Sequence, residues 1–152
     1  MNQEQSFTPR NPDYEQETRR VFDDAPFIQT LGVELLEFKP GSCVTCLPLR
    51  PDHRQQDGFV HAGVQATLAD HTAGTAGATL TGPGERVMTA EFKINLLRAA
   101  AGETLQCEAR VLRPGRRLIV AESDVFALNG DTRRLVARAM VTLAVVSLNE
   151  ES

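Results

Sequence analysis

The stretch Ala62–Leu80 reads AGVQATLADHTAGTAGATL, and we expect it to form the one long helix around which the fold is built. Its alanines recur at intervals of three and four residues, so on a helix they form a continuous stripe of Ala62, Ala66, Ala69, Ala73 and Ala76. A neighbouring stripe consists of Gly63, Thr67, Asp70, Gly74 and Gly77. An interior glycine costs a helix about 1 kcal/mol relative to alanine, so these glycines indicate that something approaches the helix backbone closely.

Asp70 lies in the middle of the second stripe. One interpretation is an exposed aspartate on a solvated face, which is the common situation for an isolated Asp. The alternative is a partly buried carboxylate, which needs a hydrogen-bonding or charged partner. The small residues on both sides of Asp70 favour a packed surface, and a polar segment that ends in His61 precedes the helix. We therefore treat Asp70 as a candidate functional residue.

The start of the helix offers a second chemical feature. Backbone N–H groups in a first helical turn have no partner within the helix and carry partial positive charge, so those of Ala62 and Gly63 can hold an oxyanion. Asp70 lies eight residues further along, or about 12 Å at a rise of 1.5 Å per residue. Because reacting atoms must come within about 3.5 Å, one chain cannot supply both groups. Two antiparallel helices around a two-fold axis would bring them together.

The segments before the long helix predict a flexible tail, a short helix and a hairpin. Residues 1–14 are polar and contain two prolines, so we expect a flexible tail that packs little. Apolar spacing between Glu15 and Leu31 predicts a short amphipathic helix that Pro26 breaks or restarts, with Gly32 as its stop. Two short apolar runs between Val33 and Arg50 predict two strands joined at Pro40-Gly41.

Four strand-like segments follow the long helix, each bounded by turn residues. They are Val87–Leu97, Thr104–Leu112, Leu118–Leu128 and Arg134–Val146. Asn129-Gly130 predicts a type I′ hairpin turn. Pro114-Gly115 suits a type II turn, with a bulge or a longer loop as the alternative. This order predicts an α+β fold in which residues 15–152 form one domain, with a curved, mostly antiparallel sheet wrapped around the central helix.

Composition excludes several classes of protein. Apolar residues make up 41% of the 152 residues and charged residues 24%, as in folded globular domains. A net charge of −4 gives no general attraction to nucleic acid. No apolar run reaches the roughly 20 residues that span a bilayer, and the polar N-terminus is unlike a secretory signal, so we expect a cytoplasmic protein that does not enter membranes. The three cysteines are expected to be reduced thiols.

Two motifs point to a family. The run QQDGFVHAG, residues 55–63, stands before Asp70, and TAEFKIN, residues 89–95, begins within the first strand after the helix. Together they resemble the hotdog-fold acyl-CoA thioesterases of the PaaI-like, phenylacetate-degradation family. The resemblance covers about residues 30–146, and it implies an acyl-CoA substrate, no cofactor, no metal, and a homotetramer built from homodimers.

The resemblance also implies roles for individual residues. Asp70 is the general base or nucleophile, and the backbone amide of Ala62, just after His61, polarises the thioester carbonyl. Thr89 occupies the place of a serine or threonine that holds the attacking water. The family often has asparagine where this chain has Gln55 and glycine where it has Ala62. A glutamine can still donate and accept hydrogen bonds, and alanine retains the backbone donor.

Histidines and cysteines allow other interpretations. Cys43 and Cys46 have the spacing of a metal or redox pair, but residues three apart on a strand point to opposite faces, so we expect no metal site. The three histidines are too scattered in sequence to predict a metal site. Hotdog dehydratases use a histidine for proton transfer, which gives His61 an alternative role. We expect His61 instead to position the loop before the helix.

The remaining predictions concern the substrate. Arg113, Arg116 and Arg117 cluster around one turn and are suited to the phosphates of CoA, although a solvated hairpin tip is the alternative. The first functional hypothesis is hydrolysis of a small aryl- or medium-chain acyl-CoA to free acid and CoA. The second is a noncatalytic module that binds acyl-CoA or regulates another protein.

Overall fold

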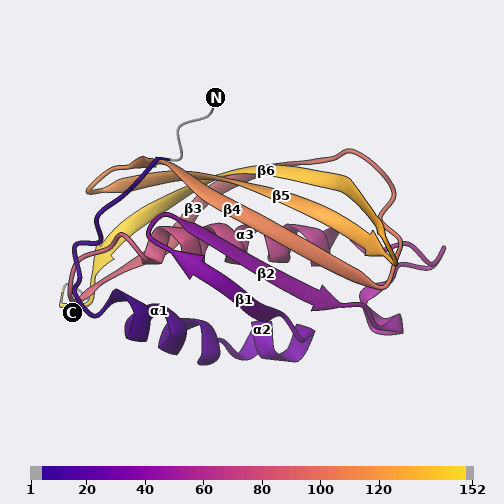
Figure 1. Ribbon diagram of the computed structural model, residues 1–152, viewed down its shortest axis with the longest axis horizontal. Helices are drawn as coiled ribbons and strands as arrows, with labels where there is room; N and C mark the ends of the chain where they lie inside the picture. Colours follow the sequence, from indigo (N-terminus) through magenta and orange to yellow (C-terminus); the bar gives the residue numbers. More distant parts are fainter. Residues whose placement is uncertain (1–4, 150–152) are drawn as a thin grey trace.

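The computed structural model describes residues 5–149 and shows one antiparallel sheet curved around a long helix (Figure 1). The helices are α1 (Tyr14–Asp23), α2 (Pro26–Leu31) and α3 (Ala62–Ala78), with a short 3₁₀ helix, η1 (Pro51–His53), before α3. The strands are β1 (Glu34–Lys39), β2 (Ser42–Pro48), β3 (Glu85–Leu96), β4 (Thr104–Pro114), β5 (Leu118–Asn129) and β6 (Thr132–Ser147). Their order is β1-β2-β4-β5-β6-β3. The predicted α+β class and central helix are confirmed.

The predicted element boundaries near the N-terminus also agree with the structure. The amphipathic segment forms two helices because Pro26, which has no N–H to donate, begins the second one. Gly32 ends α2 with a φ of 87°, a left-handed conformation that glycine adopts readily. Gly41, with a φ of 84°, makes the turn between β1 and β2. Helices α1 and α2 lie next to β1, along that edge of the sheet (Figure 1).

Two turns differ from the prediction. Asn129 pairs with Thr132, so the two central residues of the β5–β6 hairpin are Gly130 and Asp131. Gly130 has a φ of 56° but Asp131 does not have positive φ, so a type I′ turn, which needs positive φ at both central positions, is wrong. Gly115 does not have positive φ either, which excludes a type II turn there. The β4–β5 hairpin instead has the expected longer loop and a bulge, between Val111 and Arg113.

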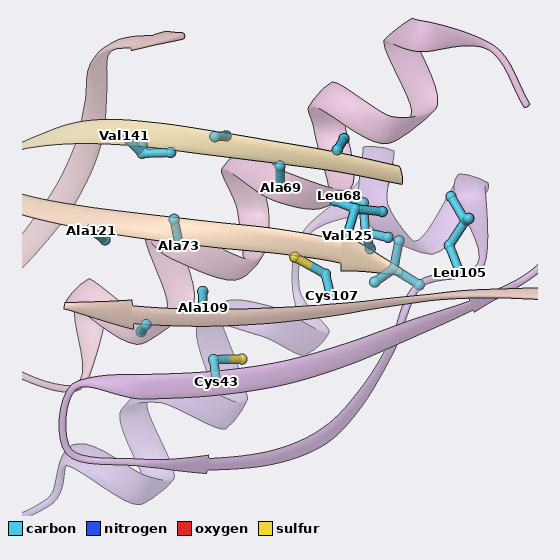
Figure 2. Packing of buried hydrophobic residues seen from close by; sticks show 14 of the residues in the cluster. Cys43, Leu68, Ala69, Ala73, Leu105, Cys107, Ala109, Ala121, Val125 and Val141 are labelled. Carbon is cyan, nitrogen blue, oxygen red and sulfur yellow. The ribbon is translucent and has the colours of Figure 1, made fainter. Parts of the chain in front are cut away.

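Small residues let the sheet lie close to α3. Ala69 and Ala73 are completely buried under the strands (Figure 2). The Thr72 hydroxyl lies 2.7 Å from that of Thr45 on β2, and Ser123 on β5 donates a hydrogen bond to the Ala69 carbonyl at 2.7 Å. These buried hydroxyl contacts fix the rotation of α3 against the sheet, because leaving a buried polar group unpaired is costly. They therefore determine which face of α3 remains uncovered.

Part of the segment expected to be a loose tail is held on the fold. The partly buried ring of Phe7 lies directly over Gly41. Arg10 forms an ion pair with Glu85 at 2.8 Å and donates to the Leu80 carbonyl at 3.2 Å. These contacts tie the chain before α1 to the start of β3. Residues 1–4 of the predicted tail lie outside the described residues. No helix within residues 5–149 has the length and apolar character to cross a membrane.

Candidate active site

Asp70 lies on the uncovered face of α3 and contacts Thr89 on β3. The Thr89 hydroxyl donates a hydrogen bond to Asp70 Oδ1 at 2.7 Å. Partial burial raises the pKa of Asp70 above its ordinary value, and the Thr89 hydrogen bond opposes this by a smaller amount. A raised pKa makes the ionised carboxylate a stronger base than an exposed aspartate. The pair therefore places a carboxylate and a hydroxyl side by side, where both can contact a ligand.

A β-bulge aims Thr89 at the helix. Thr89 lies opposite Leu143, a completely buried residue on β6, so both side chains face α3. The register between β3 and β6 shifts between Thr89 and Glu91. Further along, Phe92 lies opposite the buried Val141 and so faces α3 as well. Thr89 and Phe92 can share a face at this odd spacing only because the bulge inserts one residue.

The start of α3 has one occupied and one open amide. His61 caps the helix, and its Nδ1 accepts a hydrogen bond from the Gly63 N–H at 2.8 Å. This requires an unprotonated Nδ1. Ala62 is exposed, and its N–H has no hydrogen-bond partner among the described residues. Of the two amides that the sequence singles out, that of Ala62 is therefore the one open to a ligand, while His61 holds the loop against the helix.

Gln55 shapes its own loop. Its side-chain oxygen accepts a hydrogen bond from the Asp57 N–H, and its backbone N–H donates to the Phe59 carbonyl at 2.8 Å. Gly58, with a φ of 87°, makes the tight return of this loop. Gln55 makes no hydrogen bond to Asp70 within residues 5–149. The structure thus places Gln55 in the loop before α3 and apart from the Asp70–Thr89 pair of the same chain.

The three arginines lie at the far end of the molecule from the start of α3. They are exposed and belong to the end of β4 and the loop that follows it. The N–H of Val111 on β4 donates to the Gly41 carbonyl, and the Gly41 N–H donates to Thr79, the residue that ends α3. This hairpin end therefore lies beside the C-terminus of α3. No ion pair within the described residues involves Arg113, Arg116 or Arg117.

A pocket of about 440 Å³ opens beside Asp70, between α1, α3 and β3. Its wall includes the Asp70–Thr89 pair, Val21 and Phe22 of α1, and His71 and Gly74 of α3. The predicted residues at the helix start and on the β4–β5 loop do not line it. The structure therefore brings Asp70 and Thr89 together, and leaves Gln55, the helix start and the arginines outside the pocket of this chain.

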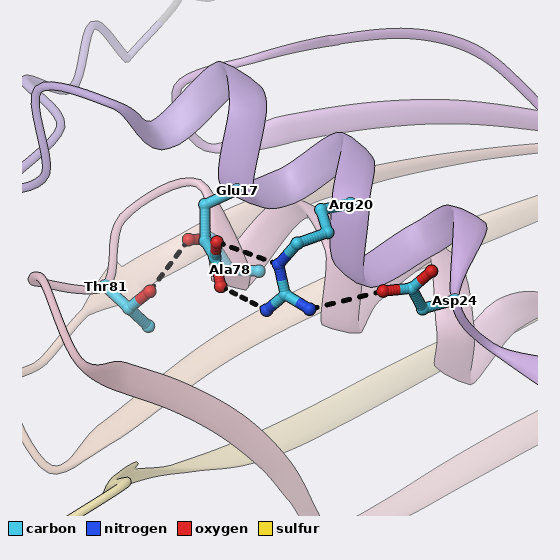
Figure 3. A network of polar contacts seen from close by, with 5 residues as sticks. All are labelled: Glu17, Arg20, Asp24, Ala78 and Thr81. Atoms are coloured by element: carbon cyan, nitrogen blue, oxygen red, sulfur yellow. Dashed lines mark hydrogen bonds and ion pairs between the residues drawn. The ribbon is translucent and has the colours of Figure 1, made fainter.

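Charged residues of α1 at the rim of the pocket form ion pairs with one another. Arg20 of α1 pairs with Glu17 at 2.6 Å and with Asp24 at 3.3 Å (Figure 3). The Arg20 guanidinium lowers the pKa of the Glu17 carboxyl, and these exposed pairs are screened by solvent. Across the rim, Thr81 donates to the Ala78 carbonyl at 2.9 Å and closes the end of α3 (Figure 3). The charges that α1 presents at the rim thus already have partners, while Arg86 on the β3 side of the pocket has no ion-pair partner among the described residues.

His71 is a site residue that the sequence interpretation missed. Burial lowers its pKa to about 4, so the ring is neutral near pH 7. The ring packs on Phe22 of α1 with centroids 5.0 Å apart, and its buried Nε2 has no hydrogen-bond partner among the described residues. In the sequence, the feature that could have identified His71 was its position directly after Asp70. The apolar residues of α1 indicated packing, but not that they cover a pocket.

The cysteines separate as expected. Cys43 is buried and Cys46 is partly exposed, so the two lie on opposite faces of β2. Burial raises the pKa of Cys46 to about 11 and that of Cys107 to about 12, so neither is a reactive thiolate near pH 7. Within residues 5–149, no group of three or more His, Cys, Asp or Glu side chains is placed to hold a metal ion.

Comparisons with known proteins agree with this fold. Residues 57–133 match the model of the thioesterase superfamily. A thioesterase family protein from Silicibacter pomeroyi is 35% identical, with a TM-score of 0.86 over 88% of this chain and 98% of the other. A Listeria monocytogenes relative named 1,4-dihydroxy-2-naphthoyl-CoA hydrolase is 26% identical over 117 residues, covering 77% of this chain and 93% of the relative. The PaaI protein of Escherichia coli, from the phenylacetic acid degradation operon, is 18% identical and shares the fold, with a TM-score of 0.78 over 91% of this chain and 96% of the other. The chain belongs to the thioesterase superfamily, on the hotdog fold.

Proposed function

We propose that this protein hydrolyses acyl-CoA thioesters and belongs to the PaaI-like group of its superfamily. The observation that carries the proposal is the hydrogen-bonded pair of Asp70 and Thr89 at the wall of a pocket. Membership of the thioesterase superfamily supports hydrolysis of a thioester. The substrate class is a small aryl- or medium-chain acyl-CoA. The name of the Listeria relative, 1,4-dihydroxy-2-naphthoyl-CoA hydrolase, favours an aryl acyl group.

The proposed reaction uses Asp70 as general base or nucleophile. As a base, Asp70 takes a proton from a water held with the Thr89 hydroxyl, and the water oxygen bonds to the thioester carbonyl carbon. The carbonyl oxygen becomes an oxyanion, which an N–H donor stabilises. The C–S bond then breaks, and the CoA thiolate receives the proton from Asp70. As a nucleophile, Asp70 instead bonds to the thioester carbonyl carbon, the C–S bond breaks and CoA leaves as its thiolate, and water then hydrolyses the mixed anhydride to the free acid and the Asp70 carboxylate. Neither route requires a cofactor or a metal.

The oxyanion donor comes from a second copy of the chain. Asp70 and the open Ala62 amide lie on one straight helix, about 12 Å apart along its axis, so a homodimer is the smallest active unit. The edge strand β3 supports this, because its outer edge pairs with no other strand of the described residues, and β3 exposes Met88 and Phe92 to 55% and 39%. By family resemblance, two such dimers form a homotetramer.

CoA binding is assigned to the arginines at the end of β4. Arg113, Arg116 and Arg117 have no acidic partner within the described residues, so their guanidinium groups are available to phosphates. They lie beside the C-terminus of α3. In an antiparallel pair of helices that places Asp70 beside the partner's Ala62, that end lies about 13 Å further along the helix axis than the thioester carbonyl, because Thr79 follows Asp70 by nine residues.

Release of free thiol tests the proposal. Benzoyl-, phenylacetyl- and straight-chain acyl-CoA are offered to the wild type and to Asp70→Asn, which keeps size but removes the base. We expect Asp70→Asn to lose at least about 100-fold in kcat with unchanged oligomeric mass. Equal turnover by both proteins would contradict the role of Asp70. Saturable acyl-CoA binding by the wild type without any thiol release would favour the noncatalytic alternative.

A further inference from the structure

The glycines inside α3 have different neighbours. A Cβ atom added at Gly77 would collide with the side chain of Leu143, and one added at Gly63 would lie 3.0 Å from the His61 ring. These two glycines are explained by contacts within the chain. A Cβ added at Gly74 would meet no described atom within 4 Å. Gly74 therefore has no reason within the described chain to be glycine, although glycine weakens the middle of a helix.

Gly74 opens onto the pocket directly beside the candidate base. It lines the 440 Å³ pocket and follows Asp70 by one helical turn, so the two lie on the same face of α3. Because Gly74 has no side chain, the helix backbone is exposed there, next to the position where the acyl group would join the thioester carbonyl. A cavity of about 150 Å³ holds a benzene molecule, so this pocket has room for a ring and its substituents.

The aromatic and apolar residues around this opening suit a flat group. Phe22 and the neutral ring of His71 form one wall, and Val87 of β3 contributes to another. The charges nearest to the α1 wall, those around Arg20, are already paired at the rim, whereas Arg86 of β3 lines the pocket without an ion-pair partner among the described residues. A charged acyl group would lose its hydration here without gaining a free partner from that cluster.

We propose that Gly74 determines acyl specificity: the pocket beneath α1 receives the acyl group, and a ring attached at the carbonyl or one carbon away lies against the α3 backbone at Gly74. An unbranched chain is narrower and does not need this space. The inference rests on the proposed function and narrows its substrate to aryl thioesters. It also assigns α1 the role of the outer wall of the acyl site.

Graded filling of the pocket tests the proposal. The variants are Gly74→Ala, Gly74→Val and, as a comparator one turn further from Asp70, Ala78→Val. For each, kcat/KM is measured with benzoyl-, phenylacetyl- and hexanoyl-CoA, together with Tm and oligomeric mass. We expect Gly74→Val to lower the ratio of aryl to hexanoyl turnover by about tenfold or more, since a single methylene in a pocket changes selectivity by that order. Gly74→Ala should have a smaller effect, and Ala78→Val should change benzoyl-CoA turnover less than Gly74→Val does.

Four results would overturn the proposal. If wild type hydrolyses the substrates and Gly74→Val leaves the ratio unchanged, Gly74 does not set specificity while the proposed function stands. If Gly74→Val slows all substrates equally and changes the oligomeric mass, Gly74 serves contact with a second chain. If wild type releases thiol only from hexanoyl-CoA, the aryl assignment fails; release from no substrate would remove the proposed function as well.

Discussion

Thr89 and Asp70 are 19 residues apart in sequence, yet the Thr89 hydroxyl donates to the Asp70 carboxylate at 2.7 Å. This bond lowers the pKa of Asp70 against the larger, opposite effect of burial. Thr89→Ala should therefore raise that pKa further and move the acid limb of the kcat/KM profile to higher pH, while Thr89→Ser should restore it. Profiles of the three proteins check this. If the acid limb of the kcat/KM profile has the same apparent pKa in Thr89→Ala as in the wild type, Asp70 does not titrate in the reaction.

Ala62→Pro removes the candidate oxyanion donor without removing the helix. Ala62 is the first residue of α3, where proline is well tolerated. His61, with φ −60° and ψ 139°, already has the extended conformation that precedes proline. We expect Tm to change little and kcat to fall about 100- to 1,000-fold. Ala62→Val, which keeps the N–H, is the matched control. Full activity of Ala62→Pro would rule out this amide as the donor.

Two glycines of α3 should respond oppositely to the same substitution. Gly74→Ala adds a methyl group in open space and should stabilise the protein by up to about 1 kcal/mol. Gly77→Ala forces the new methyl group against Leu143 and should destabilise it by about 1–3 kcal/mol. Urea unfolding of both variants measures the difference. Stabilisation of Gly77→Ala would mean that Leu143 moves aside freely.

His71 should make the fold sensitive to acid. Its folded pKa, about 4, lies below the ordinary 6.5, so between these values the unfolded chain binds the proton more readily. The stabilising effect of a neutral His71 is thus complete above pH 6.5 and is lost as pH falls towards 4, at about 1.4 kcal/mol per pH unit. His71→Phe should lose less stability than wild type between pH 7 and pH 5. An equal loss in urea unfolding would contradict the assignment.

Much of the fold follows from local sequence patterns. The spacing of alanines identifies α3, Pro26 identifies the break between α1 and α2, and turn residues separate the four later strands. The turn type between β5 and β6 does not follow, because it depends on the register that pairs Asn129 with Thr132. That register is set by packing of whole strands, which local propensity does not contain.

The site is predictable only in part. Helical spacing singles out Asp70, and the first turn of α3 singles out Ala62. The contact with Thr89 was expected only by resemblance, since it depends on a β-bulge that has no distinct signal in the segment around Ala90. The pocket wall formed by α1 was missed because it depends on how two helices distant in sequence pack.

A mixed dimer tests most directly whether the two halves of the site come from different chains. Asp70→Asn and Ala62→Pro should each be inactive as homodimers. When the two are unfolded together and refolded as a mixture, half of the dimers are mixed and each contains one intact site, so about a quarter of wild-type thiol release should return. Return of that activity is the result we predict. A mixture that contains mixed dimers and stays inactive would contradict a site shared between Asp70 of one chain and Ala62 of the other.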